Sequence, residues 1–415
     1  MTVGRYWTTL SAPGAWRFVL PGILARFPIG MTSISILLFV SATREDYGIA
    51  GALTAAAAIG YAVAAPQLAR LSDRVGQRKV LLSCAVACAA SGTTFVISTQ
   101  RPDAPIWVLF ATAATMGAAT PAIGSMVRAR WSALLDGSTL KVTAFALESV
   151  IDEVIFIVGP VVATVLATGV DPAAGVITSV VLICGGSVLL SLSERTEPPR
   201  KIGAPDVGSA LFLGPVAVFA GINLCFGGIW GAIDIATISF AAALQRDVMV
   251  GVLLAVYAIG GLVGGIAFGS RDWPVPMPRI VQISTLAMTA GLIPMLLAHT
   301  FLQAGLVLLI AGIASAPAMI AAMTLVADGV PASRRTEAMA WQSTALWLGV
   351  ASGSSAGGHL ADSHGASAAY TFAIACGAVG FVITMVGRRL MQRHQVEHSA
   401  PPPISSSHST EASNR

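Results

Sequence analysis

The stretch KVTAFALESVIDEVIFIVGPVVATVLAT, residues 141–168, is apolar enough and long enough to cross a lipid bilayer as one helix. It nevertheless carries three carboxylates close together, Glu148, Asp152 and Glu153. A carboxylate in the middle of a membrane costs roughly 2.5–3.5 kcal/mol on insertion scales, so it needs a partner inside the protein or a water-filled cavity. We therefore predict that this helix lines a translocation pathway, and that at least one acid carries a proton or faces a cation.

The composition of the whole chain is that of an integral membrane protein. Of its 415 residues 55% are hydrophobic and 11% charged, with a mean hydropathy of +0.77, whereas a soluble domain has about 25% charged residues. Its apolar runs are about 20 residues long, which predicts helices rather than a membrane barrel. The first run has no small-residue cleavage pattern and is interpreted as a retained helix.

Other chemistry is not indicated. The chain shows no nucleophile–base pair and no phosphate loop, so we expect no enzyme, no cofactor and no nucleic-acid partner. His359, Asp362 and His364 could form a metal site but are interpreted as solvated side chains. The five cysteines lie in apolar runs and are interpreted as small buried side chains.

Twelve spans are predicted, which makes the fold class an all-α membrane protein. Their approximate limits are 17–41, 47–69, 80–98, 105–127, 143–168, 173–192, 209–237, 248–269, 280–298, 301–326, 337–360 and 366–387. The longest polar break, residues 193–208, divides the chain into six-helix halves at 1–192 and 209–392. The Pro- and Ser-rich segment 393–415 is expected to be a disordered tail.

The basic residues predict the orientation in the membrane. With both termini cytoplasmic, 20 of the 24 Lys and Arg residues fall on the cytoplasmic side. Three, Arg44, Arg101 and Arg246, fall on the opposite side, and Arg26 lies within the first span. Cytoplasmic loops of membrane proteins carry an excess of Lys and Arg. We therefore expect cytoplasmic termini in a plasma membrane, the bacterial inner membrane.

The two halves repeat each other. A shift of 200 residues matches Gly51, Gly60 and their neighbours in the second span to Gly251 and Gly260 in the eighth. A shift of 194 matches the fifth span to the eleventh. Small residues at four-residue spacing permit close helix contact, either for static packing or for sliding of one half on the other. In the eleventh span this stripe consists of Ala345, Gly349, Gly353 and Gly357. The repeat predicts two pseudo-symmetric six-helix bundles around a central cavity.

The loop ARLSDRVGQRKVLL, residues 69–82, lies between the second and third spans. It resembles the signature loop of the major facilitator superfamily, Gly-x-Leu-Ala-Asp-Arg-x-Gly-Arg-Arg/Lys, although Ala69, Ser72 and Gln77 depart from that pattern. The resemblance implies a cytoplasmic gate. In it, Asp73 would bond near the start of the eleventh span, and Arg74 or Arg78 would bond to an acid such as Asp136. The predicted gating-loop residues are Asp73, Arg74, Gly76, Arg78 and Lys79.

Gly159 and Pro160 in the fifth span form a predicted helix kink. The pair is similar to the Gly-Pro motif of the superfamily's drug antiporters, but Val162-Ala163 replaces the usual Gly-Gly and Ile155 replaces another glycine. The fourth span also lacks the mid-membrane arginine common in proton-coupled members. Its Arg128 and Arg130 are expected at the cytoplasmic end.

Arg26 is predicted to pair with an acid of the fifth span. It lies roughly 15 Å into the membrane, and Asp152 lies roughly 14 Å in, at 1.5 Å per residue. Glu148 and Asp152 share a helix face at i, i+4. A structural ion pair would explain one acid but not three. The alternative is paired titration, in which one acid stays ionised beside Arg26 and another carries the proton. Asp152 is the first choice for that proton, followed by Glu148.

The second half lacks these acids, since Gln342, Leu346 and Trp347 occupy the equivalent positions. It is instead expected to contribute substrate-binding residues. The predicted cavity set is Asn223, Trp230, Tyr257, Trp341, Gln342 and Trp347. Asp234 is interpreted as an interfacial acid.

The function predicted from these features is proton-coupled export of small amphipathic or hydrophobic compounds by a monomeric secondary transporter. The spans expected to line the cavity are mainly Ala, Gly, Met, Val and Leu, which disfavours a sugar or peptide carrier. Proton-coupled import of a polar metabolite is the alternative within transport. A membrane sensor or assembly protein is the alternative of another class.

Overall fold

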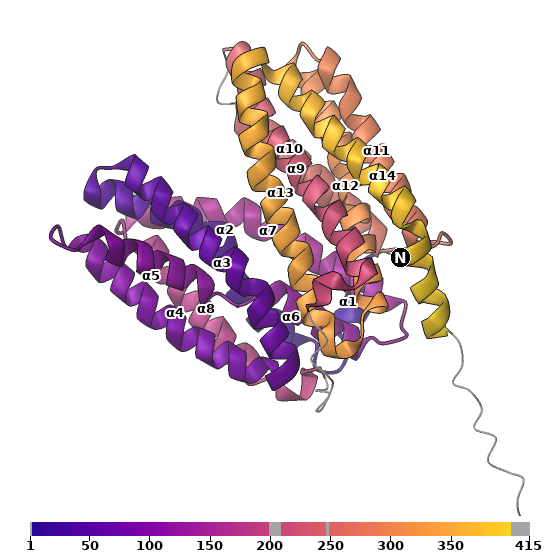
Figure 1. Cartoon of the computed structure of the whole chain (residues 1–415), viewed down its shortest axis with the longest axis horizontal. Helices are drawn as coiled ribbons and strands as arrows, with labels where there is room; N and C mark the ends of the chain where they lie inside the picture. The colour runs from indigo at the N-terminus through magenta and orange to yellow at the C-terminus, as the bar shows by residue number, and fades with distance from the viewer. Residues whose placement is uncertain (1, 199–208, 246–248, 400–415) are drawn as a thin grey trace, which may run out of the picture.

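The computed structural model describes residues 2–198, 209–245 and 249–399, which form helices and turns without strands (Figure 1). The first half contains α1 (Thr2–Leu10), α2 (Trp16–Arg44), α3 (Tyr47–Val75), α4 (Gln77–Gln100), α5 (Ile106–Ala118), α6 (Ile123–Leu134), α7 (Leu140–Gly169) and α8 (Ala174–Ser191). The second half contains α9 (Gly214–Ala243), α10 (Met249–Gly269), α11 (Met277–Leu292), α12 (Phe301–Gly329), α13 (Arg335–His364) and α14 (Ala366–Ser399).

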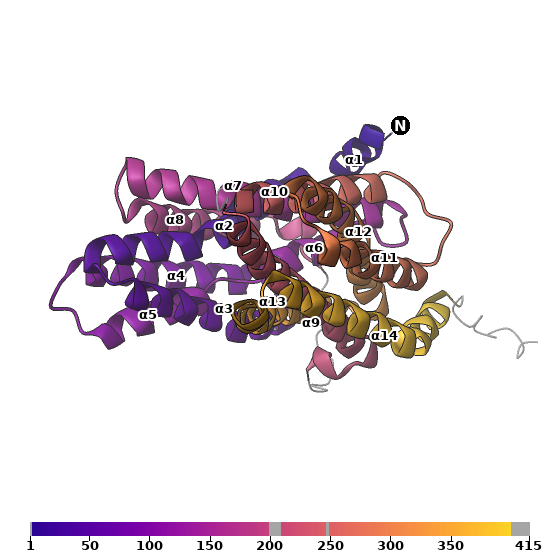
Figure 2. The same ribbon diagram turned by 90° about the horizontal axis from the view of Figure 1, so that it is seen from above.

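The described chain holds twelve membrane-spanning elements, as predicted. Eleven stretches are long and apolar enough to cross a membrane; α5 with α6 forms one of them, and α11 with the 3-10 turn Ile293–Leu297 forms another. The twelfth is α13, which has 30 residues and is rich in serine and glycine. These small and polar residues lower its hydropathy, but it packs along the full second half beside α9 (Figure 2).

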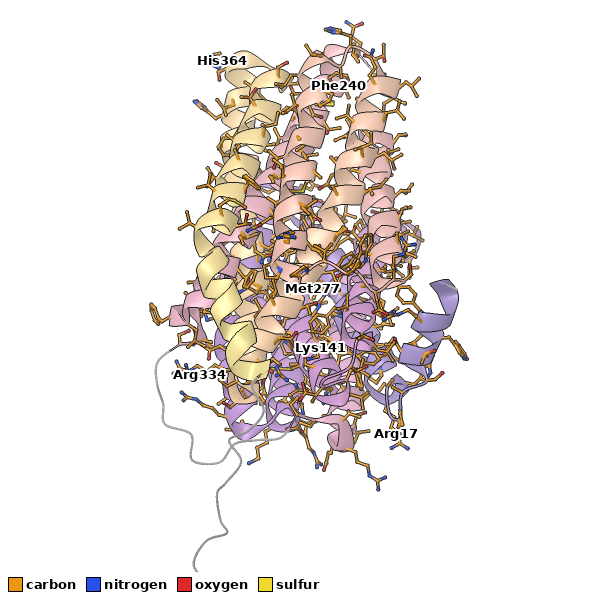
Figure 3. All side chains as sticks on the ribbon, turned by 90° about the vertical axis from the view of Figure 1, so that its right-hand side faces the viewer. Arg17, Lys141, Phe240, Met277, Arg334 and His364 are labelled. Carbon is orange, nitrogen blue, oxygen red and sulfur yellow. The ribbon has the colours of Figure 1, made fainter. Side chains whose placement is uncertain are left out.

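The two halves are arranged as two groups of helices that meet at one end and spread apart at the other (Figure 1). Two seams join the groups, α3 against α13 and α7 against α10 (Figure 2). The joined end carries the basic side chains Arg17, Lys141 and Arg334, whereas Phe240 and His364 lie at the other end (Figure 3). We call the first of these the basic end.

Glycines bring α9 and α13 into backbone contact. A Cβ atom added at Gly349 or Gly353 would overlap backbone atoms of α9, and one at Gly227 would overlap the backbone of α13. Small residues at such an interface let two membrane helices approach closely, because packing and not hydrophobicity drives their association. The stripe of small residues that contains Gly349 and Gly353 is therefore a packing surface in this conformation.

Three features differ from the predicted spans. A short helix, α1, precedes the first span and was not predicted. The fourth span is broken after Ala118, because Pro121 lacks an N–H donor and disfavours the helical conformation of the residue before it. After the break the span continues to Leu134. Finally, α14 continues to Ser399, into the segment predicted to be a tail. The rest of that tail, residues 400–415, lies outside the described residues, as does most of the central loop, residues 199–208.

Candidate translocation site

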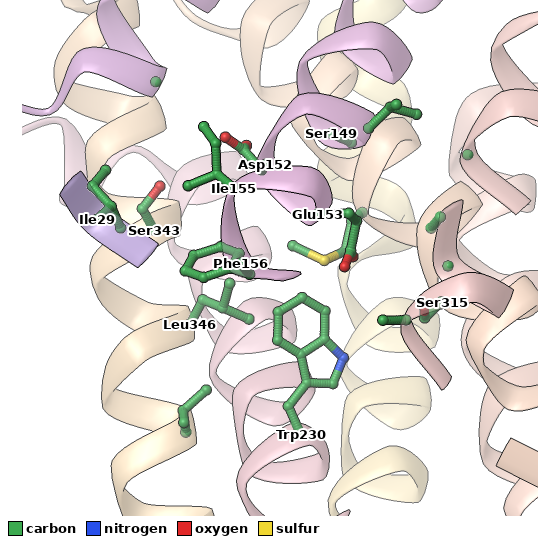
Figure 4. Close-up of a pocket in the computed structure, with 18 of the residues that line it drawn as sticks. Ile29, Ser149, Asp152, Glu153, Ile155, Phe156, Trp230, Ser315, Ser343 and Leu346 are labelled. Atoms are coloured by element: carbon green, nitrogen blue, oxygen red, sulfur yellow. The ribbon is translucent and has the colours of Figure 1, made fainter. Parts of the chain in front are cut away.

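A cavity of about 570 Å³ lies between the two halves. Its walls come from α2, α3, α6 and α7 on one side, and from α9, α10, α12 and α13 on the other. The volume is in the range that holds a small organic ligand. Figure 4 shows that Glu153 of α7 points toward Trp230 and that Phe156 lies beside Leu346 of the second half, whereas Asp152 lies further from both.

A charged cluster forms the first-half wall. The guanidinium of Arg26 donates to Glu148 at 2.5 Å and to Asp152 at 3.0 Å. Glu148 is fully buried and also accepts a hydrogen bond from the indole N–H of Trp131, at 2.7 Å. Both pairings of Arg26 with α7 are thus present, since all three charged groups lie at one depth in the bundle. Breaking a buried pair of this kind leaves an uncompensated charge, which is strongly destabilising.

Arg128 belongs to the same cluster, contrary to the prediction that it lies in the loop at the cytoplasmic end. Its guanidinium donates to the second oxygen of Asp152, at 2.7 Å. The fourth span continues to Leu134, beyond its predicted end at residue 127, so Arg128 lies inside the span. Gly124 makes room, since a Cβ there would come within 3.1 Å of the Arg128 guanidinium. Arg130 instead points away from the cavity and binds Gln77 and the carbonyl of Ser193.

Glu153 differs from its two neighbours. Its carboxylate lies against α10, where a Cβ atom added at Gly261 would be 3.4 Å from it. Within the described residues, it takes part in no hydrogen bond and no ion pair. Glu148 and Asp152 thus hold arginine partners inside the first half, whereas Glu153 faces the second half.

Aromatic side chains form the opposite wall. Trp230, Tyr257 and Trp347 line the cavity, as predicted from the sequence. The Trp347 ring meets Phe156 of α7 edge to face, with 5.6 Å between ring centroids. Asp234, interpreted from the sequence as an interfacial acid, also lines the cavity.

The other three predicted cavity residues lie elsewhere. The side-chain amide of Asn223 donates to Gln342 at 2.9 Å, and Gln342 in turn donates to the carbonyl of Val216. Both amides are buried and tie α9 to α13. The indole of Trp341 donates to Ser209 at the basic end. Residue type and span can be predicted from the sequence, but the direction in which each side chain points cannot.

The predicted kink residues lie where α7 crosses α2. A Cβ at Gly159 would overlap the backbone of Gly30, so this glycine permits a close crossing. Pro160 lies within an unbroken α7. The pair is therefore part of a contact inside the first half.

The basic end is closed by contacts between the halves. Asp73, at the end of α3, accepts a hydrogen bond from the backbone N–H of Glu337 at 2.9 Å, in the first turn of α13. The first N–H groups of a helix have no partner within it, and a carboxylate there is favourable. Further along the same end, Lys141 donates to Asp328 at 2.7 Å. Thr143 donates to the carbonyl of Gly269 at 2.7 Å.

The rest of the predicted gating loop lies on this face. Gly76 has a φ of +98°, which favours glycine, and it separates α3 from α4. Arg78 pairs with Glu194, not with an acid near the fourth and fifth spans. The carboxylate suggested for that role, Asp136, instead lies 3.5 Å from Lys141. Arg74 and Lys79 are exposed on the same face.

The helix α1 also bridges the halves at the basic end. Arg5 donates to Asp272 at 2.8 Å, and the Tyr6 hydroxyl donates to the carbonyl of Ile266 at 3.1 Å. The hydrogen bond from Arg5 lowers the pKa of Asp272, and the bond to Asp272 raises the pKa of Arg5. Burial raises the pKa of Tyr6 to about 12, so its hydroxyl stays protonated.

Twelve membrane spans in two groups, a cavity between the groups and a closed basic end define a membrane carrier protein. The sequence matches the family model of the Major Facilitator Superfamily over residues 22–308 and 276–410. The chain therefore belongs to this superfamily, as the loop at residues 69–82 indicated. Members of the superfamily are carriers rather than enzymes, and the chain is a secondary transporter. No curated protein sequence matches it.

Solved structures share the fold at low sequence identity. The human organic anion transporter MFSD10 is 15% identical, with a TM-score of 0.69 over 89% of this chain and 99% of that one. A bacterial homologue of the iron transporter ferroportin, in an outward-facing state, is 14% identical, with a TM-score of 0.72 over 90% and 98%. The proton:xylose symporter XylE is 14% identical, with a TM-score of 0.65 over 91% and 95%. An organic anion, iron and a sugar are three different cargoes, so the fold does not define the substrate here.

Proposed function

We propose that this protein is a proton-coupled exporter of small amphipathic or hydrophobic compounds that works as a monomer by alternating access. The observation that carries the proposal is the unpaired carboxylate of Glu153 in the central cavity, next to a cluster in which the other acids of α7 hold arginine partners. The mainly apolar and aromatic wall around it supports an amphipathic cargo rather than a sugar.

The basic end is the cytoplasmic end in this proposal. The bias of Lys and Arg toward that end supports it, and it places both termini in the cytoplasm of a bacterial cell. The structure would then be closed to the cytoplasm and open to the outside. Segments 1–192 and 209–392 would be the two moving bundles, joined by the loop 193–208.

Glu153 is the acid best placed to carry the coupled proton. Asp152 was the first choice from the sequence, but its two oxygens hold Arg26 and Arg128, and a proton there would break two ion pairs. Glu148 holds Arg26 and Trp131. Glu153 can bind and release a proton without breaking any contact between described residues. Its charge also lies at the α7–α10 seam, where the halves must separate.

The contacts of the basic end would serve as the cytoplasmic gate. Asp73 joins α3 to the first turn of α13, and Lys141 joins α7 to α12. Opening toward the cytoplasm requires both to break. The charge state of Glu153 would bias that opening from the other end of the same seam.

A transport assay tests the proposal directly. Purified protein in proteoliposomes would be screened with amphipathic compounds, with and without a pH gradient across the membrane. We expect the gradient to drive accumulation of at least one apolar or amphipathic compound, and expect collapse of the gradient to abolish it. Gradient-independent equilibration only, or gradient-driven uptake of polar sugars alone, would contradict the proposal.

A further inference from the structure

We infer that the central cavity binds a monovalent organic cation with an apolar body and a hydrogen-bond acceptor, held between Glu153 of the first half and Asp234 of the second. This inference rests on the proposed transport function and specifies its substrate class.

The charge balance of the cavity favours a cation. Four carboxylates, Glu148, Asp152, Glu153 and Asp234, lie in or directly behind its walls. Against them stand two guanidinium groups, and both are engaged by Glu148 and Asp152. Asp234, like Glu153, has no hydrogen bond or ion pair within the described residues. Two negative charges thus remain for a ligand to compensate, and an anion would meet repulsion here.

Aromatic rings stand beside these two acids. Trp230 precedes Asp234 by four residues on α9, so both side chains project from one helix face. Tyr257 of α10 and Phe156 of α7 line the same space. A cation over an aromatic face is attracted by the electron-rich ring, more strongly when it is desolvated, and Trp is the best partner. A diffuse organic cation therefore fits this wall better than a small hydrated metal ion.

Two buried hydrogen-bond donors indicate that the ligand carries a hydrogen-bond acceptor. The indole N–H of Trp230 and the hydroxyl of Tyr257 are shielded from solvent. Both lie near each other and near Ser315, but neither atom makes a hydrogen bond of acceptable geometry within the described chain. A buried donor without a partner is destabilising, because it has lost its hydrogen bonds to water without replacing them. A carbonyl or ether oxygen on the cargo would satisfy them while the cationic group lies between the acids.

A binding measurement on the full-length protein in nanodiscs tests the inference without any transport. The probes are benzoylcholine, which carries a quaternary ammonium and an ester carbonyl, and its neutral tert-butyl carbon isostere. Calorimetry with wild type should show benzoylcholine binding at least tenfold more tightly. Glu153→Gln and Asp234→Asn should each reduce that preference about tenfold while binding of the neutral isostere is kept. Asp103→Asn, an exposed acid outside the cavity, is the matched control.

The donors are tested with a third probe, trimethyl(phenylbutyl)ammonium, which keeps the charge and the length of benzoylcholine and lacks the ester oxygens. Wild type should prefer benzoylcholine, and Tyr257→Phe should remove the difference. Equal wild-type affinity for benzoylcholine and its neutral isostere would overturn the inference, as would a cation preference that survives the Glu153→Gln/Asp234→Asn double variant. Because the wild-type comparison needs no variant, a misfolded mutant leaves the inference testable.

The outcomes separate this inference from the proposed function. Gradient-driven transport of neutral compounds with no preference for cations would contradict the substrate class alone. Cation binding without any gradient-driven transport would instead contradict proton coupling.

Discussion

The guanidinium of Arg128 lies 2.7 Å from the carboxylate of Asp152 and so completes a cluster in which α2 and α6 both hold α7. Asp152 is therefore bound by two arginines from two other spans. This arrangement makes Asp152 an organising group of the first half and leaves Glu153 as the acid that faces the second half.

The Arg128–Asp152 pair should show energetic coupling. We expect a double-mutant cycle with Arg128→Gln and Asp152→Asn to give an interaction energy of about 0.5–3 kcal/mol in the unfolding free energy, because Asp152→Asn leaves Arg128 without its partner and Arg128→Gln removes one of the two arginines that hold Asp152. Denaturation in detergent measures it. Arg128→Gln combined with Asp171→Asn, in a distant loop, should be additive. Additivity of the Arg128 and Asp152 changes would show that their contact contributes nothing.

Asp73→Asn should weaken the closed basic end without preventing membrane insertion. The amide can still accept the N–H of Glu337, but the negative charge at the start of α13 is lost. The interaction of a negative charge with a helix N-terminus is worth roughly 0.3–1 kcal/mol, up to about a fivefold change in a population ratio. Spin labels at Ser138 and Arg271, in a cysteine-free background, would report it as a larger fraction of long distances and a lower transport rate. Unchanged distances and rates would rule out the gating role.

The Arg5–Asp272 contact should depend on salt but not on physiological pH. Arg5 lowers the pKa of Asp272, so the contact is fully formed above the ordinary aspartate pKa of about 4 and is lost only as the pH falls below it. The raised pKa of Arg5 keeps the opposite charge to well above neutral pH. Both side chains are partly exposed, and exposed pairs are screened by salt. The difference in thermal stability between wild type and Asp272→Asn should shrink with rising ionic strength and stay constant from about pH 5 to 8; a change in that difference within this pH range would contradict the prediction.

Gly353→Ala should destabilise the second half. A Cβ at Gly353 would overlap the backbone of Gly228, which cannot move aside as a flexible side chain could. Overpacking of this kind costs roughly 1–3 kcal/mol. Gly358→Ala is the matched control on the same helix, because no atom lies within 4 Å of the added Cβ. Thermal denaturation should show a lower Tm for the first variant only, and equal Tm values would mean that α9 and α13 can separate at no cost.

The sequence predicted the fold well because its signals are local. Apolar runs and the loop around Asp73 and Gly76 specify spans and family. The pairing of Arg26 with Glu148 and Asp152 also followed, since helix rise converts residue number into depth. Arg128 was placed wrongly because the fourth span was predicted to end at residue 127, whereas it continues past the break at Pro121 to Leu134. The misplaced Asn223, Trp341 and Gln342 show a second limit: the direction of a side chain depends on neighbours from distant segments.

The central claim is that Glu153 carries the coupled proton, and it is tested most directly by comparing Glu153→Gln with Asp152→Asn in proteoliposomes. For each, gradient-driven accumulation and gradient-free exchange of the same saturating substrate would be measured. We predict that Glu153→Gln loses accumulation and keeps exchange, whereas Asp152→Asn, which leaves Arg128 without its partner and Arg26 with Glu148 alone, reduces both. Retained accumulation in Glu153→Gln, with loss only in Asp152→Asn, would contradict the account and assign the proton to Asp152.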